Sequence, residues 1–261
     1  HPGVKVHYET GIRKEDYSEW LDRKILEGET PDVFMVLSDD FYKYVSLNVI
    51  SDLDNQIAND RNFKKEYFFD TVLDIGKYHE SQYALPYEVV PTLMFVNKTL
   101  LEQEGIEVPN ENWTWSTMEQ IVDQITKDKN GDGVIDQFGT YNYTWKEAVY
   151  SNGAELFDKD GKKAFFSGTK VNEAVKFVKK LNEMNGGREV TQNDFDSGNV
   201  AFMPLAFSEY RTYKTYPYKI KKYTSFQWDC TSMPAGPGGH NTSEVDALLM
   251  TIGNKSKHKE L

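Results

Sequence analysis

Cysteine is almost absent from this sequence, and so is any excess of positive charge. The single cysteine, Cys230, excludes an intramolecular disulfide and a zinc site built from several thiolates, and we expect a small buried hydrophobic residue there. The 30 basic and 41 acidic residues give a net charge of −11. Nucleic acid and anionic membrane surfaces both select a basic face, so we expect neither as a partner.

Long hydrophobic runs and familiar catalytic motifs are missing as well. The longest strongly apolar stretch without charge, residues 89–96, contains Pro91 and Thr92, whereas a membrane helix needs about 18 or more apolar residues. The chain has no Gly-x-Ser-x-Gly, no His-Glu-x-x-His and no Walker phosphate loop. Its five histidines are scattered, and none stands beside a candidate nucleophile. These absences lower the expectation of an enzyme without excluding one.

The segments that are present predict an α/β protein. The 261 residues suit one large or two modest domains. Alternation predicts a strand over residues 4–8, and helical spacing predicts a helix over residues 14–27 with Tyr17, Trp20, Leu21 and Ile25 on its buried face. The nearly continuous apolar run at 31–37 is typical of a strand buried on both faces of a parallel sheet, and a helix is expected from Phe41 to Leu47.

Further elements follow along the chain. Ser116 and Glu119 fit a capping box, with Trp115 as the hydrophobic staple in front of it. The other expected elements are a hairpin in 77–85, a strand at 89–97, a helix at 98–104 closed by Gly105, a helix at 171–184 with Val171, Ala174, Val175, Val178 and Leu181 aligned, a turn at 195–199 and a strand at 200–203.

Residues 128–136 carry the spacing of a calcium loop. Oxygen-bearing side chains stand at its first, third, fifth and ninth positions (Asp128, Asn130, Asp132 and Asp136), and Val134 offers its carbonyl at the seventh. The twelfth position is Gly139 instead of glutamate, so Gln137 or a distant acid would have to replace the bidentate ligand. A structural calcium ion and a polar turn held by Asx hydrogen bonds both remain open. No other cofactor is expected.

Aromatic residues gather in the predicted loops. A flat apolar ring edged by hydrogen-bonding groups suits a sugar, and the carboxylates Asp39, Asp40 and Glu88 could accept pairs of hydroxyl hydrogens. Asp39 or Asp40 is equally well placed as the N-cap of the helix expected from Phe41. The rings are Tyr87, Trp113, Trp115, Trp145, Tyr150, Tyr210 and Trp228, and ordinary core packing is the alternative for most of them.

Eight segments, in order over nearly the whole chain, resemble the family-1 extracellular solute-binding proteins of ABC importers, the sugar-binding group that includes maltose-binding protein. They are HPGVKV at 1–6, PDVF at 31–34, YALPYE at 83–88 with FVNK at 95–98, NWTWS at 112–116, DKNGDG at 128–133, FDSGNVAFM at 195–203 and MPAGPGG at 233–239. Where family members carry tryptophan to stack on sugar, this chain has Val36 and Phe207.

The resemblance implies a type II periplasmic-binding-protein-like fold, with two α/β lobes joined by crossover strands. The lobes would be residues 1–90 and 91–241, and 242–261 would return to the first lobe, with crossings near 88–93 and 245–248. Solute would lie in the cleft, where loops after the strands converge. The residues carried over as ligand-binding are Ser38, Asp39, Asp40, Tyr87, Glu88, Tyr150, Asn152, Phe207 and Glu209, with Leu37, Gly153 and Ala206 beside them.

The implied function is a non-enzymatic, monomeric carbohydrate-binding component of an ABC importer that closes on its ligand and presents it to membrane permease subunits. Such proteins are periplasmic or lipid-anchored at the cell surface. We expect the family's first strand and helix before His1, its closing helices after Leu261, and no signal segment in this chain. Two other functions stay open: a glycoside hydrolase using Asp39 and Glu88 as paired carboxylates, and a calcium-regulated structural protein.

Overall fold

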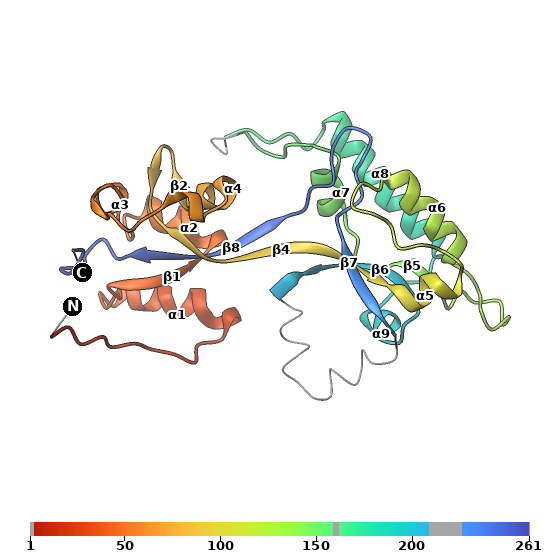
Figure 1. The fold of residues 1–261 in the computed structure, drawn as a ribbon, viewed down its shortest axis with the longest axis horizontal. Coiled ribbons are helices and arrows are strands. Elements are labelled where there is room, and N and C mark those ends of the chain that lie inside the picture. Colours follow the sequence, from red (N-terminus) through yellow and green to blue (C-terminus); the bar gives the residue numbers. More distant parts are fainter. Residues whose placement is uncertain (1–2, 159–161, 209–225, 261) are drawn as a thin grey trace. The chain divides into compact units, whose positions relative to one another are not determined.

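A computed structural model describes residues 3–158, 162–208 and 226–260 of the chain. The chain divides into two compact units, which are described separately (Figure 1). Unit 1 comprises His1–Val89 and Val245–Leu261, and unit 2 comprises Val90–Glu244. The chain passes from unit 1 to unit 2 inside strand β4 (Leu85–Asn97) and returns directly before strand β8 (Val245–Ile252).

Unit 1 is built around an antiparallel strand pair. Strand β1 (Val33–Leu37) pairs with β8, from Val33 opposite Ile252 to Leu37 opposite Leu248. The other elements of the unit are α1 (Lys14–Leu26), α2 (Ser38–Ser46), α3 (Asp54–Asn59), α4 (Asp70–Leu73), the 3₁₀ turns η1 (Lys65–Tyr67) and η2 (Asp74–Gly76), and the short hairpin β2 (Lys77–Tyr78) and β3 (Ser81–Gln82).

The strand prediction for residues 31–37 is right about the strand and wrong about its surroundings. The partner strand is antiparallel, and burial alternates, with Phe34 and Val36 buried while Val33 is 55% exposed. The strand therefore has one core-facing side, although its outward positions are also apolar.

The strand predicted at residues 4–8 is absent. Val6 and Tyr8 are 77% and 81% exposed, and no strand of the described chain pairs with this segment. Alternation favours a strand only where a partner and a core face exist.

The helix predicted at 14–27 is confirmed as α1. Leu21 is buried in a core with Phe34, Val36, Phe41 and Tyr44, and Tyr17, Trp20 and Ile25 pack against that core from the same helix. The hairpin predicted in residues 77–85 is confirmed by β2 and β3.

Unit 2 holds a mixed sheet in which β4 lies between β6 (Val200–Ala206) and β7 (Trp228–Thr231). Both neighbours are antiparallel to β4, and β5 runs parallel to β6 at the edge. The elements of this unit after β4 are α5 (Lys98–Gln103), α6 (Trp115–Ile125), β5 (Phe138–Thr140), α7 (Trp145–Ser151), α8 (Thr169–Met184), α9 (Gln192–Asp196), β6 (Val200–Ala206) and β7 (Trp228–Thr231). Figure 1 shows α6 and α8 side by side, and they are in contact.

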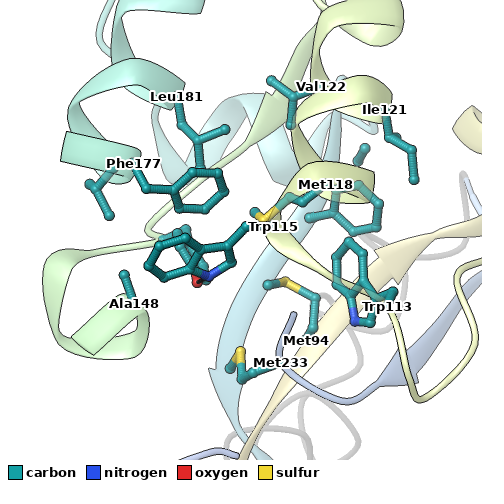
Figure 2. Packing of buried hydrophobic residues seen from close by; sticks show 14 of the residues in the cluster. Met94, Trp113, Trp115, Met118, Ile121, Val122, Ala148, Phe177, Leu181 and Met233 are labelled. Atoms are coloured by element: carbon teal, nitrogen blue, oxygen red, sulfur yellow. Dashed lines mark hydrogen bonds between the residues drawn. The ribbon is translucent and has the colours of Figure 1, made fainter. Parts of the chain in front are cut away.

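Helices α6, α7 and α8 enclose the larger hydrophobic core of unit 2 (Figure 2). At its centre the Trp115 indole stacks on Phe177 at 4.3 Å with the ring planes 4° apart. Its Nε1 donates hydrogen bonds to Tyr143 and Ser151, so the polar atom of this buried ring is satisfied. An aromatic pair of this kind adds about 0.5–1.5 kcal/mol beyond the burial of its area.

This packing corrects the predicted start of α6. The N-cap is Thr114, whose hydroxyl accepts the Thr117 N–H at 3.3 Å, and Trp115 is the first helical residue. The predicted capping box at Ser116 and the staple role of Trp115 are therefore wrong, because the helix begins at Trp115 and the Trp115 indole packs inside the core. Helix α9 likewise takes up Phe195 and Asp196, which were expected in a turn.

The helix predicted at 171–184 is confirmed as α8, with one exception on its stripe. Val171, Ala174, Val178 and Leu181 are buried, but Val175 is 47% exposed. The predicted strand at 89–97 and the helix at 98–104 are found as β4 and α5, and Asn97 caps α5 by accepting the Leu100 N–H.

Candidate functional site

In unit 1, the polar residues after β1 form the first turn of α2. Helix α2 begins at Ser38, Leu37 is its N-cap, and no side chain caps it. The expected start at Phe41 and the N-cap role for Asp39 or Asp40 are therefore wrong. Two carboxylates in the first turn still stabilise the helix through its dipole, which favours negative charge at this end.

Asp40 has a structural role. Its carboxylate accepts the Ser18 hydroxyl at 2.5 Å, which ties α2 to α1, and pairs with Lys43 of the same helix at 2.9 Å. Burial alone would raise the pKa of Asp40, but the hydrogen bonds from Lys43 and Ser18 outweigh it and leave this pKa lowered. Both oxygens are engaged within the protein, so the structure does not favour the predicted ligand contact.

Asp39 is more accessible than Asp40, whereas Ser38 is half-buried. Asp39 is exposed, and no hydrogen bond or ion pair of its side chain is found within the described residues. Ser38 donates a hydrogen bond to the Asp246 carboxylate on β8, which adds a third polar side chain to this end of the strand pair. Sequence reasoning missed Asp246, although a charged residue inside the apolar run 245–252 was the available signal.

On β4, Tyr87 and Glu88 differ in exposure. Tyr87 is 66% exposed, which leaves a large ring face open to solvent, and Glu88 is half-buried. The exposed Tyr87 ring and the exposed Asp39 carboxylate give unit 1 two groups suited to a hydroxylated solute.

In unit 2, the candidate residues lie at the end of α7 and after β6. Tyr150 is 36% exposed, and its backbone carbonyl accepts the Thr242 hydroxyl at 3.0 Å. Phe207 directly follows β6 and is 40% exposed. Glu209 and Tyr210 lie outside the described residues.

Asn152 is buried and its side chain is engaged within the fold, so the structure does not favour the predicted ligand contact. Its side chain has no exposed surface, donates to the Lys170 carbonyl at 2.9 Å and to Glu173 at 3.0 Å, and accepts the Gly238 N–H at 2.9 Å. It thus anchors the loop at 234–239 to the end of α7 and the start of α8.

Glycines make this anchoring possible. A Cβ on Gly239 would lie 2.2 Å from the Ser151 carbonyl oxygen, and one on Gly236 would lie 2.5 Å from the Asn152 Oδ1 atom. The close approach of the two backbones therefore requires glycine at both positions.

The loop at 128–136 folds around its own side chains. The two Asp128 carboxylate oxygens accept the Gly131 and Gly133 N–H groups, each at 2.6 Å. Asn130 accepts the Asp132 N–H, and Asp132 accepts the Val134 N–H, both at 2.8 Å. The hydrogen bond from Gly133 is the largest cause of the lowered pKa of Asp128. These hydrogen bonds form Asx-type turns, which the sequence predicts as the alternative to a calcium site.

Within the described residues, the fold brings no cluster of acidic side chains together at the predicted calcium loop. Asp136 accepts the Lys129 N–H at 2.7 Å, and Gln137, proposed to replace the missing glutamate, is buried and donates to Glu104 and to the Ile125 carbonyl. Within the described ranges, no group of three or more His, Cys, Asp or Glu side chains could hold a metal ion. Structural calcium therefore stays a prediction.

The remaining aromatic candidates divide between core and surface. Trp113 and Trp115 are buried, Trp228 stacks on Phe95 at 5.1 Å, and Trp145 is 45% exposed. Cys230 on β7 is half-buried, and burial, with a contribution from Asp229, raises the pKa of its thiol to about 11, which makes it an unreactive packing residue.

Two α/β units linked through β4 and β8, with exposed carboxylates and rings near strand ends, are the arrangement expected of a two-lobed solute-binding protein. The chain belongs to the bacterial extracellular solute-binding protein family, which it matches over residues 1–261. The resemblance stated from the sequence is thereby confirmed. None of the helices in the described part of the chain is long and apolar enough to span a membrane.

Solved structures share this fold at low sequence identity. The ABC substrate-binding protein Lmo0181 from Listeria monocytogenes, in complex with cycloalternan, is 21% identical with a TM-score of 0.74, and the match covers 95% of this chain and 63% of that one. MalE from Xanthomonas citri is 19% identical with a TM-score of 0.75, covering 95% and 64%. The cyclic α-maltosyl-1,6-maltose binding protein from Arthrobacter globiformis is 15% identical with a TM-score of 0.77, covering 96% and 63%.

The chain thus spans less than two thirds of the length of these structures. No curated protein sequence matches it. The structural likeness establishes a mixed α/β fold of the maltose-binding-protein type.

Proposed function

We propose that this chain belongs to the extracytoplasmic solute-binding component of an ABC importer, and that it binds a neutral carbohydrate, most simply an oligosaccharide. The observation that carries the proposal is the family match over residues 1–261. Two structural neighbours support the ligand class, since one is solved with cycloalternan and another is a cyclic α-maltosyl-1,6-maltose binding protein. The proposed binding place is the cleft expected from the family resemblance.

The exposed groups of each unit agree with such a ligand. Asp39 in unit 1 offers an accessible carboxylate, which accepts hydrogen bonds from two hydroxyl groups at once. Tyr87 in unit 1, and Tyr150 and Phe207 in unit 2, offer ring faces for the apolar side of a sugar. Asp40 and Asn152 are left out of the proposed site because their polar atoms are engaged in the fold.

The proposal includes the rest of the transport role. The carbohydrate-bound form would be recognised by membrane permease subunits, the protein would act as a monomer in the periplasm or on a lipid anchor, and nucleic acid would not be a partner. Structural calcium in the loop at 128–136 is part of the same proposal.

A thermal-shift screen over oligosaccharides tests the proposal. A ligand present at about 100 times its Kd raises the free energy of unfolding by about 2.7 kcal/mol. Chromatography of the sugar after several hours with the protein separates carbohydrate binding from glycoside hydrolysis, because a binder leaves the sugar intact and a glycoside hydrolase shortens it. A screen in which no sugar raises the melting temperature would count against carbohydrate binding.

A further inference from the structure

Unit 2 contains a groove of about 840 Å³ that none of the predicted ligand-binding residues lines. One wall is the connection from β5 into α7, residues 140–145, and the other is the outer face of α8 from Val175 to Glu183. Asn185 and residues 187–190 complete the lining. Helices α7 and α8 are in contact and adjacent in Figure 1, so the groove belongs to unit 2 alone. Its volume lies within the range of small-molecule sites, about 300–1,000 Å³.

The lining combines apolar faces with amide groups. Trp145 and Val175 are 45% and 47% exposed, and Tyr141 is half-buried. Val175 belongs to the apolar stripe of α8 and is nevertheless exposed, because it faces the groove instead of the core. Asn142 and Asn182 are exposed amides in the same lining, and each amide can both donate and accept a hydrogen bond. An aromatic ring beside amides is the combination that suits a sugar's apolar face and its hydroxyl rim.

The charges in the lining balance one another. Lys179 and Glu183 form an ion pair at 3.6 Å on α8. Arg188 pairs with Asp194 at 3.1 Å, donates to the Ile135 carbonyl and lies over the Phe138 ring, so its guanidinium is already engaged. Glu189 adds a second acidic residue against two basic ones. A groove without excess charge favours a neutral ligand over an anion or a cation.

One residue of the lining, Asn185, has a side-chain acceptor without a hydrogen-bond donor in the described part of the chain. Asn185 is only 5% exposed, and its side-chain Oδ1 has no hydrogen-bond partner in the described part of the chain. A buried acceptor without a donor costs about 1–3 kcal/mol. The Asn185 Oδ1 atom is itself buried, so it lies beneath the groove surface and is not one of the proposed sugar contacts.

We propose that this groove is a second carbohydrate site, which takes a neutral monosaccharide or disaccharide through Trp145, Asn142 and Asn182. It is separate from the residues of the proposed function and does not depend on them. A second site on unit 2 would give the chain two sugar contacts of different affinity, with the groove as the weaker one because it is open and has few polar anchors.

The test follows the Trp145 indole N–H by NMR during sugar titrations of the full chain. The probes are methyl α-D-glucopyranoside, methyl α-D-mannopyranoside, maltose and mannobiose, each to about 50 mM, which detects a Kd in the millimolar range. Trp145→Phe assigns the resonance among the five tryptophans. At least one probe is expected to shift the Trp145 signal saturably.

Two substitutions on the exposed face of α8 test the groove: one fills it, and the other places the same ring outside it as a control. Asn182→Trp fills the groove and is expected to weaken the Trp145 response at least tenfold in Kd, whereas Lys176→Trp places the same ring on an exposed position outside the lining and is expected to leave it unchanged. Equal melting temperatures confirm that both variants fold.

The outcomes separate this proposal from the proposed function. A Trp145 shift that persists in Asp39→Asn and disappears in Asn182→Trp supports a second site. The proposal is overturned if no probe moves the Trp145 signal, or if Asn182→Trp leaves its titration unchanged. Carbohydrate binding detected by calorimetry without any Trp145 shift overturns the proposal that the groove binds sugar, and it leaves the proposed function standing.

Discussion

Replacing Asn152 by alanine separates a structural role from a ligand-binding role. The change removes the acceptor of the Gly238 N–H and the donor to the Lys170 carbonyl, and leaves a small cavity in a position without exposed surface. One buried backbone group without a partner costs about 1–3 kcal/mol, so with the lost packing we expect a loss of about 2–4 kcal/mol in the unfolding free energy of unit 2. The melting temperature should fall by roughly 5–15 °C.

Tryptophan fluorescence during urea unfolding measures this loss of stability in unit 2, where Asn152 lies. Trp113, Trp115, Trp145 and Trp228 belong to unit 2, and only Trp20 belongs to unit 1. Asn182→Ala is the matched control, since that asparagine is exposed on α8 and its replacement should change stability by less than about 0.5 kcal/mol.

Asn152→Ala should lower stability without a direct effect on binding. Below the melting transition, Asn152→Ala should bind sugar with a Kd within about threefold of the wild-type value. A variant that melts like the wild type but has lost sugar binding would refute the structural role and restore the contact expected from sequence.

Three further results are expected. Gly239→Ala should lose at least about 2 kcal/mol of stability by urea unfolding because its Cβ would lie 2.2 Å from a backbone oxygen. Gly168→Ala, whose nearest neighbour would be 3.6 Å away and which changes only the N-cap of α8, should lose less than about 1 kcal/mol. If the loop at 128–136 holds calcium, EDTA should lower the melting temperature and Asp132→Ala should remove that difference, and identical melts with and without EDTA would contradict the prediction. The lowered pKa of Asp128 means that its contribution is complete above the unfolded pKa of about 3.9 and is lost as the pH falls through the folded value. The stability difference between wild type and Asp128→Asn should therefore shrink below about pH 4, and a difference that grows with acid would contradict the cause assigned to the shift.

Elements with strong local signals could be predicted from sequence. Helix α8 has an apolar stripe over its whole length, and α5 ends before Gly105, whose φ of 68° is easily adopted by glycine. The predictions that were wrong concern segments whose structure depends on partners far away in the sequence. The antiparallel partner of β1 lies more than 200 residues away at β8, and the alternation at residues 4–8 does not say whether any strand pairs with it.

The site shows the same division between local and distant information. Sequence placed Asp39, Tyr87 and Phe207 at strand ends, and the structure leaves all three exposed. It could not show that Asn152 is enclosed by the glycine loop at 234–239, or that Ser18 and Lys43 engage Asp40, since both depend on contacts between separate elements. Asp246 was missed because its relation to Ser38 exists only after β1 and β8 pair.

Isothermal titration calorimetry with the best oligosaccharide from the thermal-shift screen tests the central claim most directly. We predict saturable binding of an intact neutral sugar, and a loss of about 1.5–3 kcal/mol of binding free energy in Asp39→Asn. That loss corresponds to a Kd raised by about 10- to 150-fold. The stability of the free protein should fall by no more than about 0.3–1 kcal/mol, because Asp39 also interacts with the N-terminal dipole of α2. Hydrolysis of the sugar during the titration, or no binding heat with any sugar of the panel, would contradict it.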